Sequence, residues 1–554
     1  MKRILLFLVL FGAHAVLLAD VKLPAFFADH MVLQREMPVP IWGTADAGEK
    51  VTVAFAGQQT TATADTAGTW RVTLDKLAAS AEPRELTVSG SNTRKISDVL
   101  VGEVWLASGQ SNMGFPLASA HNAAEALANA TDGQLRFFTV QNATAAEPLG
   151  DVRGTWQASD PNTAKSFSAV AYFFARELRA KLGVPIAILH SSWGGTPAQA
   201  WLSMDAIRQA PPFENYVQRY DEALVKHREV LAHPETMEAY RRDLAQWQKE
   251  VAPAFNDAMR AWNAGPKTSP KPTPAKPEPA NPDPMDIPSP SLRPGTPSVI
   301  FNAKIAPLAG CALRGAIWYQ GEANGGQGVE YRTLLPRLIG DWRARWAQGD
   351  FPFLIVQLAA WDMDKNPAPM HQWPWLREAQ SLTVKTVPKT GLAIAIDVGD
   401  PKDVHPKGKL AVGQRLALAA RKIAYGENVV YSGPVLRVMK IDGAKVRAQF
   451  TDIGGGLIIG QAPWRAEGDP QWPQDKLIGF TIAGEDRVWH DAEANIDGDS
   501  VILSSGEVPK PVAIRYGWAN APRCNLYNRE GLPASPFRSD DWPMPAAGGK
   551  AAAR

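Results

Sequence analysis

Residues 101–113, VGEVWLASGQSNM, form an almost continuous apolar run that ends in Gly109-Gln110-Ser111. Four similar runs follow along the chain: VPIAILHS (184–191), GAIWYQ (315–320), FPFLIVQLA (351–359) and TGLAIAIDV (390–398). Helical patterns lie among them, at residues 168–182, 331–346 and 409–424. Apolar strands that alternate with amphipathic helices are typical of a parallel sheet covered on both faces. The sequence therefore predicts a three-layer α/β domain with a central parallel sheet over residues 99–427.

Shorter strands with alternating apolar residues flank this domain on both sides. They read VPVPIWGTA, KVTVAFAG, GTWRVTLDKL and RELTVSGS within residues 20–98, and PVLRVMKI, KVRAQFTDI, KLIGFTIAG, SVILSSGEV and PVAIRYGWA within residues 428–545. Alternation with frequent turn residues is typical of half-buried strands. We expect a β-sandwich-like domain at each end of the chain, followed by a frayed tail at residues 546–554.

One region interrupts the α/β pattern, and we interpret it as a surface insertion at about residues 210–298. Residues 213–262 are highly charged and have helical spacing. Twelve of the 33 residues from 265 to 297 are proline, which neither pairs within a sheet nor continues a helix. We expect this Pro-rich part to be extended and mobile.

The first 19 residues have the pattern of a signal peptide. Lys2 and Arg3 precede a short apolar run at residues 4–12, and small residues follow, among them Ala15 and Ala19. The run is too short to span a bilayer, and no later stretch reaches about 18 uninterrupted apolar residues. We therefore expect export to the periplasm or the medium, with no membrane span after signal cleavage.

The composition is that of a globular protein with several cores, since hydrophobic residues make up 45% of the 554 positions and charged residues 21%. The 58 Lys and Arg nearly cancel the 56 Asp and Glu, so we expect no strong field to attract nucleic acid or an anionic membrane. Cys311 and Cys524 are the two cysteines. The sequence leaves open whether they pair, and it leaves the oligomeric state open as well.

Polar and small residues follow four of the predicted strands, at 109–113 (GQSNM), 192–196 (SWGGT), 320–324 (QGEAN) and 399–406 (GDPKDVHP). In an open parallel sheet, the loops at the carboxyl ends of the strands form the binding crevice. A serine, a Gly pair, a carboxamide and a histidine near carboxylates are the parts of a serine hydrolase. We expect these loops to meet at one rim of the sheet.

Ser111 is the candidate nucleophile, although Gly-x-Ser alone is a weak signal and the second Gly of a nucleophile elbow is missing. Four histidines fall in the α/β domain outside the insertion: His121, His190, His371 and His405. His405 is the candidate base because Asp397, Asp400 and Asp403 precede it, and a base needs a partner that orients its ring.

Metal and cofactor signals are weak. Residues 362–366 (DMDKN) begin like a calcium loop, but Pro367 stands where that loop needs Gly. No Cys/His cluster has zinc spacing, and residues 454–460 (GGGLIIG) lack the spacing of a dinucleotide site. Glu322 has no clearly matched carboxylate for a glycosidase pair. We expect neither a metal nor a cofactor, since a hydrolase uses water as its second substrate.

Read together, these motifs resemble the sialate O-acetylesterase family of SGNH-type hydrolases. The matching segments are, in order, LP…MVLQR (23–35), GEVW…GQSNM (102–113), SWGGT (192–196), WYQGEAN (318–324), LREAQ (376–380), DVHP (403–406) and NLY…GLPASPFR (525–538). Each segment alone is modest, and their order along most of the chain makes the match specific. The insertion departs from a typical member.

The resemblance implies an SGNH-hydrolase-like fold and an esterase that removes acetyl groups from sugar hydroxyls. It places the nucleophile at Ser111 and the base at His405. The general pattern has Asp three residues before His, where this chain has Lys402. Asp403 is the first choice for the acid, Asp400 is the second, and a main-chain carbonyl is the third.

The tetrahedral oxyanion is assigned to the backbone N–H of Ser111, to an N–H of Gly194 or Gly195, and to Gln320. Substrate contacts are assigned to residues beside these motifs: Gln110, Asn112, Trp193, Glu322, Asn324 and Arg377. A structural role is the favoured alternative for Glu322, and Arg377 either holds a sugar carboxylate or pairs with an acid. Trp201, Trp318 and Trp361 either line the sugar wall or pack in the core.

The same machinery suits more than one acetylated carbohydrate. Acetyl-sialic acid and an acetylated plant polysaccharide such as xylan or pectin both remain open, because the fold does not separate them. A non-catalytic carbohydrate-binding protein, in which the flanking β domains hold the glycan, is the alternative from a different class.

Overall fold

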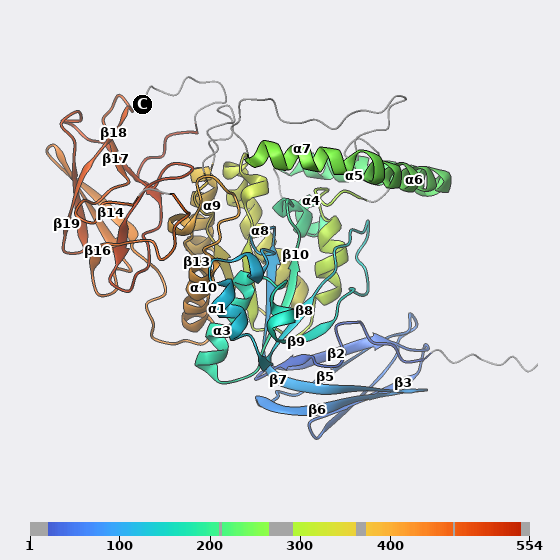
Figure 1. The fold of residues 1–554 in the computed structure, drawn as a ribbon. Coiled ribbons are helices and arrows are strands. Elements are labelled where there is room, and N and C mark those ends of the chain that lie inside the picture. Colours follow the sequence, from blue (N-terminus) through green and yellow to red (C-terminus); the bar gives the residue numbers. More distant parts are fainter. Residues whose placement is uncertain (1–19, 210–212, 265–291, 362–372, 469–470, 545–554) are drawn as a thin grey trace, which may run out of the picture.

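The computed structural model describes residues 20–209, 213–264, 292–361, 373–468 and 471–544 (Figure 1). The signal-peptide segment, most of the Pro-rich run, the calcium-like stretch, His371 and the C-terminal tail lie outside the described residues. Within the described ranges, none of the helices combines the length and the apolar character needed to cross a membrane.

Six parallel strands form the centre of the molecule in the order β13-β12-β11-β7-β10-β8, and β9 pairs antiparallel with β8 at the edge. Their bounds are β7 Thr93–Gly109, β8 Asp132–Thr139, β9 Trp156–Ser159, β10 Ile186–Ser192, β11 Gly315–Tyr319, β12 Phe353–Val356 and β13 Thr390–Ala393. This confirms the predicted α/β architecture. The run at 390–398 is a strand only as far as Ala393, and a 3₁₀ turn follows at Ile396–Val398.

Helices cover both faces of this sheet (Figure 1). The described helices of the central region are α1 Ala123–Ala128, α2 Pro161–Ala164, α3 Ala169–Leu182, α4 Met204–Arg208, α8 Gly328–Trp346, α9 Trp373–Thr386 and α10 Lys409–Ile423. Because successive strand residues point to opposite faces, Trp105 and Ala107 pack with α3 and α10, whereas Val104 and Leu106 pack in the core that α8 and α9 share. Alternate side chains of β7 therefore contribute to the apolar cores on both faces of the sheet.

The N-terminal strands build two sheets around one core. Their bounds are β1 Val32–Gln34, β2 Val39–Thr44, β3 Lys50–Phe55, β4 Gln58–Thr63, β5 Thr69–Leu74 and β6 Ser80–Ser89. β2 pairs with β5, whereas β1 and β6 pair with the first half of β7, and β3 and β4 extend that sheet beyond β6. The 17 residues of β7 run without a break from this sheet into the central one, across the position 98/99 at which the sequence suggests a boundary.

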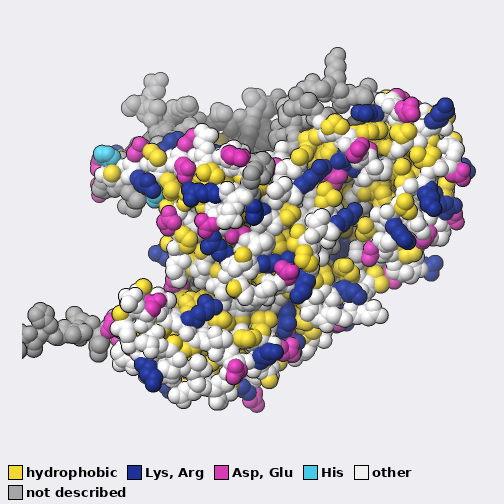
Figure 2. All heavy atoms as spheres, turned by 180° about the vertical axis from the view of Figure 1, so that it is seen from behind, with side chains coloured by type: hydrophobic (Ala, Val, Ile, Leu, Met, Phe, Trp, Pro, Cys, Tyr) yellow, Lys and Arg dark blue, Asp and Glu magenta, His cyan; other side chains and the backbone are white. Residues whose placement is uncertain are grey.

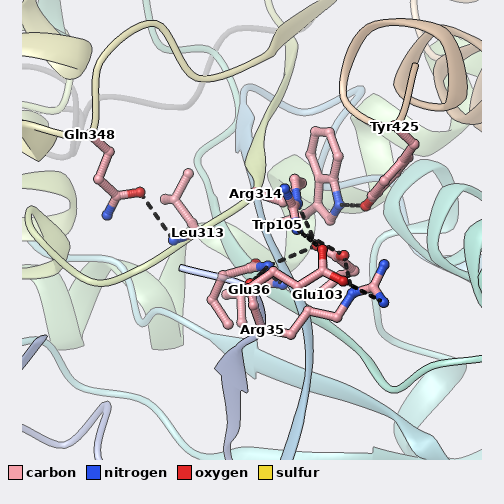
Figure 3. A network of polar contacts seen from close by, with 10 residues as sticks. Arg35, Glu36, Glu103, Trp105, Leu313, Arg314, Gln348 and Tyr425 are labelled. Atoms are coloured by element: carbon pink, nitrogen blue, oxygen red, sulfur yellow. Dashed lines mark hydrogen bonds and ion pairs between the residues drawn. The ribbon is translucent and has the colours of Figure 1, made fainter. Parts of the chain in front are cut away.

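A buried network of ion pairs and hydrogen bonds connects the N-terminal sheet to the central sheet (Figure 3). The carboxylate of Glu103, on β7, is fully buried and accepts hydrogen bonds from Nε of Arg35 (2.6 Å), Nε of Arg314 (2.7 Å) and Nε2 of Gln34 (2.8 Å). Arg314 immediately precedes β11. The network therefore joins the N-terminal sheet to two neighbouring strands of the central sheet.

The C-terminal strands form two four-stranded sheets, β14-β15-β20-β19 and β18-β17-β21-β23, which share one apolar core. The bounds are β14 Val435–Asp442, β15 Lys445–Thr451, β16 Leu457–Ile459, β17 Phe480–Ala483, β18 Trp489–Asp491, β19 Glu493–Asp497, β20 Ser500–Ser504, β21 Ala513–Tyr516, β22 Leu526–Asn528 and β23 Phe537–Arg538. Cys524 is buried in this core and Cys311 in the central one, and both are free thiols.

The helical part of the insertion forms an arm that projects from the central domain (Figure 1). It consists of α5 Glu214–Ala232, α6 Pro234–Glu250 and α7 Ala252–Ala264. Phe213 and Tyr216 are buried at its base. On the face of the molecule turned toward the reader in Figure 2, basic and acidic side chains are interspersed.

Replacing the buried carboxylate tests the junction. In Glu103→Gln, Arg35 and Arg314 lose their buried counter-charge and keep the longer ion pairs, at 3.4 Å, with the exposed Glu36. Breaking a buried pair costs about 3–5 kcal/mol. We expect a clearly lower midpoint of urea denaturation. The control Glu85→Gln removes an exposed pair with Lys95, for which the expected cost is below about 1 kcal/mol. Equal shifts in the two variants would contradict the role of the network.

Candidate active site

A glycine at the end of β7 places Ser111. Gly109 has a φ of +132°, and a Cβ at this position would lie 2.1 Å from the carbonyl oxygen of Tyr319 on β11. The Gly109 carbonyl accepts the backbone N–H of Trp193 (3.0 Å), and the N–H of Gln110 donates to Tyr319 (3.0 Å). The chain is therefore fixed to both neighbouring strands as it leaves the sheet, and Ser111 stands in the turn just beyond.

The structure brings Ser111 and His405 together. Oγ of Ser111 lies 2.8 Å from Nε2 of His405, although the two residues are 294 positions apart. His405 belongs to the loop between the 3₁₀ turn after β13 and α10. Its side chain is 40% exposed, so a substrate in solution can reach the pair.

Asp403 lies beside the other ring nitrogen of His405. Its Oδ1 is 3.6 Å from Nδ1, which is beyond hydrogen-bond range, and the same oxygen accepts the backbone N–H of His405 at 2.8 Å. The side chain of Asp403 is 54% exposed, so solvent weakens its field. Asp400, the second candidate, accepts the backbone N–H of Lys402 (2.8 Å). Asp403 is therefore the candidate acid that lies at the ring.

The pKa of His405 is lowered from the ordinary histidine value. Burial is the largest cause, the carboxylate of Asp403 acts in the opposite direction, and the ammonium of Lys409 lowers the pKa further. A neutral imidazole is the form that accepts a proton from serine. The surroundings of His405 therefore favour the base form near neutral pH.

Gly194 lies against the serine. A Cβ built on Gly194 would come within 3.3 Å of the Ser111 Cβ, which is tighter than an ordinary contact. Among the described residues, the backbone N–H groups of Ser111 and Gly194 have no protein acceptor. Two unused donors next to a nucleophile suit an oxyanion that develops on the attacked carbonyl. Gly195 follows with a φ of +71° and completes the turn.

The assignment of Gln320 to the oxyanion requires correction. Its side chain is fully buried, and Nε2 already donates to the carbonyl of Thr196 (3.1 Å) and to Oδ1 of Asn324 (2.8 Å). Its Oε1 accepts the hydroxyl of Tyr331 (2.7 Å). Both N–H bonds are in use, so Gln320 braces the loop and has no free donor for the substrate.

Two of the predicted substrate contacts are likewise internal. Asn324 is fully buried, and its amide bonds to the backbone N–H of Ala198, to Gln320 and to Gln199. Gln110 is 3% exposed, and its Oε1 accepts the backbone N–H of Ala323 at 3.2 Å. These side chains shape the strand-end loops from inside.

Within the described part of the chain, Arg377 binds backbone carbonyls and no acidic side chain. Its fully buried guanidinium donates to Leu358 (2.8 Å) and Ala359 (2.9 Å) beyond β12, and to Ala519 and Asn520 of the C-terminal region (both 2.7 Å). Burial lowers its pKa to about 9. The expectation that Arg377 contacts substrate is therefore wrong, because it ties the C-terminal domain to the central sheet.

The tryptophans divide into two groups. Trp201 and Trp318 are fully buried and pack edge-to-face with ring centroids 6.0 Å apart, so they belong to the core. Trp193 and Trp361 are half-buried. Trp193 directly precedes Gly194, which leaves it as the aromatic residue next to the nucleophile.

His190 does not belong to the Ser111 centre. Its Nε2 lies 2.8 Å from Oγ of Ser192, and burial lowers its pKa to about 3, so the ring is neutral. His121 packs against the ring of Trp464 at a centroid distance of 6.2 Å. Among the described histidines near the strand ends, His405 is the one that reaches Ser111.

Asn112, Glu322 and Lys409 form a polar cluster behind the Ser111–His405 pair. Nδ2 of Asn112 donates to Oε1 of Glu322, and its Oδ1 accepts from Nζ of Lys409. Lys409 is a residue that sequence reasoning missed, because it reads as the first polar residue of an amphipathic helix. The signal that could have found it is its position four residues after His405.

A Ser–His pair at the carboxyl edge of a parallel sheet, with the backbone N–H groups of Ser111 and Gly194 beside the serine, is the arrangement that serine hydrolases use. Residues 298–422 match the model of the family described as carbohydrate esterase, sialic acid-specific acetylesterase. This stretch contains β11 and the loop of His405.

Relatives match over nearly the whole chain. The sialate O-acetylesterase of Rattus norvegicus is 29% identical and that of Homo sapiens 28% identical, each over 93% of this chain, covering 93% and 91% of those proteins. A crystal structure described as a novel carbohydrate acetylesterase from Xanthomonas citri is 36% identical, with a TM-score of 0.75, over 94% of this chain and 100% of that one.

The chain therefore belongs to the carbohydrate acetylesterases, and its residues 298–422 match the family described as carbohydrate esterase, sialic acid-specific acetylesterase. It is a carboxylic ester hydrolase that removes O-acetyl groups from carbohydrates.

The pH profile tests the surroundings of His405. Because kcat/KM requires a neutral ring, activity should fall as pH drops through the His405 pKa, with a midpoint below about 6.5, the value of a free histidine. Asp403 raises this pKa, so Asp403→Asn should move the midpoint to lower pH. The cost in kcat should stay below about tenfold, because exposed ion pairs contribute at most about 1 kcal/mol.

Asp400→Asn is the matched control in the same loop, and it should leave the midpoint in place. A loss in Asp403→Asn as large as that in a variant without the base would show that this carboxylate orients the ring far more strongly than its 3.6 Å separation implies.

Proposed function

We propose that catalysis proceeds through an acetyl-serine intermediate at Ser111. His405 takes the hydroxyl proton through Nε2 while Oγ attacks the acetyl carbonyl, and the C–O bond to the sugar then breaks as the imidazolium returns the proton to the leaving sugar oxygen. A water molecule next gives its proton to His405 and attacks the acetyl-enzyme, which releases acetate and restores the serine. The 2.8 Å contact between Oγ and Nε2 is the observation on which this proposal rests.

The developing oxyanion is expected to bind the backbone N–H groups of Ser111 and Gly194. Loss of one such donor typically reduces the rate by about 10²–10³-fold. Asp403 would stabilise the imidazolium from the solvent side, at the 3.6 Å separation of its Oδ1 from Nδ1. Trp193, half-buried beside Gly194, is the proposed stacking surface for a sugar ring.

We propose acetylated sialic acid as the substrate, with acetylated xylan or pectin as the alternative of the same chemistry. The names of the mammalian relatives favour the first, whereas the Xanthomonas citri relative is described only as a carbohydrate acetylesterase. Acetate release should be compared on acetyl-sialic acid, acetyl-xylan and acetyl-pectin. A higher kcat/KM on either plant polymer would overturn the proposed substrate while leaving the mechanism in place.

Ser111→Ala and His405→Ala test the mechanism. Each should lower acetate release by at least about 10³-fold, because members of such a catalytic unit act together and only binding and oxyanion contacts remain. The double variant should be no slower than the worse single variant. Wild-type rates in Ser111→Ala, with the fold intact by circular dichroism, would refute the covalent route and favour a different nucleophile or a binding protein.

We also propose that the protein is exported and that residues 1–19 are removed. The charged residues Lys2 and Arg3 before the apolar run at 4–12 support this. N-terminal sequencing of protein recovered from the periplasm or medium of a bacterial host should begin near Asp20. Recovery of an intact N-terminus in the cytoplasmic fraction would contradict export.

A further inference from the structure

Lys409 is a buried cation that the proposed acyl transfer does not use. It is the first residue of α10 and is 1% exposed. Its ammonium donates to Oδ1 of Asn112 and lies above the rings of Phe115 (4.8 Å) and Tyr319 (5.3 Å). A cation at the amino end of a helix opposes the helix dipole, so stabilisation of α10 does not account for its presence.

Asn112 joins the two catalytic loops. It directly follows Ser111, and its Nδ2 donates to the carbonyl oxygen of Val404 (2.9 Å), the residue that precedes His405. The same Nδ2 donates to Oε1 of Glu322. One side chain therefore links the loop of the nucleophile to the loop of the base.

Lys409 acts together with Glu322 and Val404 to set which way the Asn112 amide faces. An ammonium only donates hydrogen bonds and a backbone carbonyl only accepts them, so one amide orientation satisfies both Lys409 and Val404. In the flipped orientation, the amide NH₂ would face the ammonium and the amide oxygen would face the Val404 carbonyl. Without the ammonium, Glu322 and Val404 still hold Nδ2, but Oδ1 of Asn112 loses the donor that fixes the other end of the amide.

The carboxylate of Glu322 and the ammonium of Lys409 contact opposite ends of the Asn112 amide. Oε2 of Glu322 is shielded from solvent and has no hydrogen-bond partner within the described protein. Burial raises the pKa of Glu322 and lowers that of Lys409 to about 7, while the carboxylates of Glu322 and Asp403 act to raise the Lys409 value. Apolar residues of similar volume often replace a buried ion pair at no cost in stability, so stability alone does not explain why this cluster is ionic.

We propose that Lys409 is a positioning residue for acyl transfer, which orients the amide of Asn112 so that the His405 loop is held against Ser111. This inference rests on the proposed function. We expect loss of the ammonium to lower mainly the rate of the chemical step. Lys409 is buried, so it is not expected to contact a substrate that approaches Ser111 and His405 from solvent.

Lys409→Met removes the donor and keeps most of the side-chain volume. We expect kcat for acetate release to fall about 10–100-fold, since misplacement of reacting groups by about 1 Å costs on this order, with KM changed less than about twofold. Lys407→Met is the matched control, because Lys407 is exposed in the same loop and should retain wild-type kcat. Lys409→Gln keeps an N–H donor and should recover part of the rate.

The link to Asn112 is tested by a double-mutant cycle. If Lys409 acts through this amide, adding Lys409→Met to Asn112→Leu should cost less than about threefold beyond the worse single variant, whereas independent residues would multiply their losses. Should Lys409→Met fail to fold, the comparison of Lys409→Gln with Asn112→Leu reports the same link.

The pH profile supplies a readout that a purely structural role would not move. Lys409 lowers the pKa of His405, so Lys409→Met should shift the acid limb of kcat/KM to higher pH, opposite to Asp403→Asn. An unchanged kcat in Lys409→Met would overturn the inference. So would losses from Lys409→Met and Asn112→Leu that multiply in the double variant, together with an acid limb of kcat/KM that does not move in Lys409→Met. Ser111→Ala separates the acetyl-serine mechanism from the role of Lys409. If Ser111→Ala loses activity while Lys409→Met keeps the wild-type rate, only the role of Lys409 is refuted.

Discussion

The 2.8 Å contact between Ser111 Oγ and His405 Nε2 depends on how β7 ends. Gly109 occupies a backbone conformation that favours glycine, and a side chain there would collide with the Tyr319 carbonyl. Hydrogen bonds to β10 and β11 fix the chain on both sides of this point. The carboxyl ends of parallel strands lie at one edge of the sheet, so the same constraint that places Ser111 also places Gly194 beside it.

β7 connects the Glu103 network to the polar cluster at Asn112. In its middle, Glu103 holds Arg35 and Arg314 and joins the N-terminal sheet to the central one. Beyond its end, Asn112 joins the nucleophile loop to the loop of His405. Arg377 connects the C-terminal domain to the central sheet by donating hydrogen bonds to four backbone carbonyls. The flanking β domains are thus attached to the central sheet by hydrogen bonds of buried side chains, whereas the side chain of His405 is 40% exposed.

The sequence predicted the layers, the strand runs and the helices well, because apolar strands and amphipathic helices have distinct periods. It also named Ser111 and His405, whose neighbours carry recognisable chemistry. It failed for Gln320, Asn324 and Arg377, since residue type does not reveal whether a polar group faces a substrate or a backbone carbonyl. Lys409 was missed because its partner Asn112 is distant in the chain and becomes adjacent only after folding.

In the proposed mechanism, Ser111 carries the acetyl group between the two half-reactions. The direct measurement is rapid quenching of the enzyme during turnover of an activated aryl acetate, followed by peptide mass spectrometry. We expect one acetyl group on the peptide that contains Ser111, formed in a burst with the first equivalent of aryl alcohol and absent from Ser111→Ala. Acetate release at the full rate with that peptide unmodified, or with the acetyl group on another side chain, would contradict it.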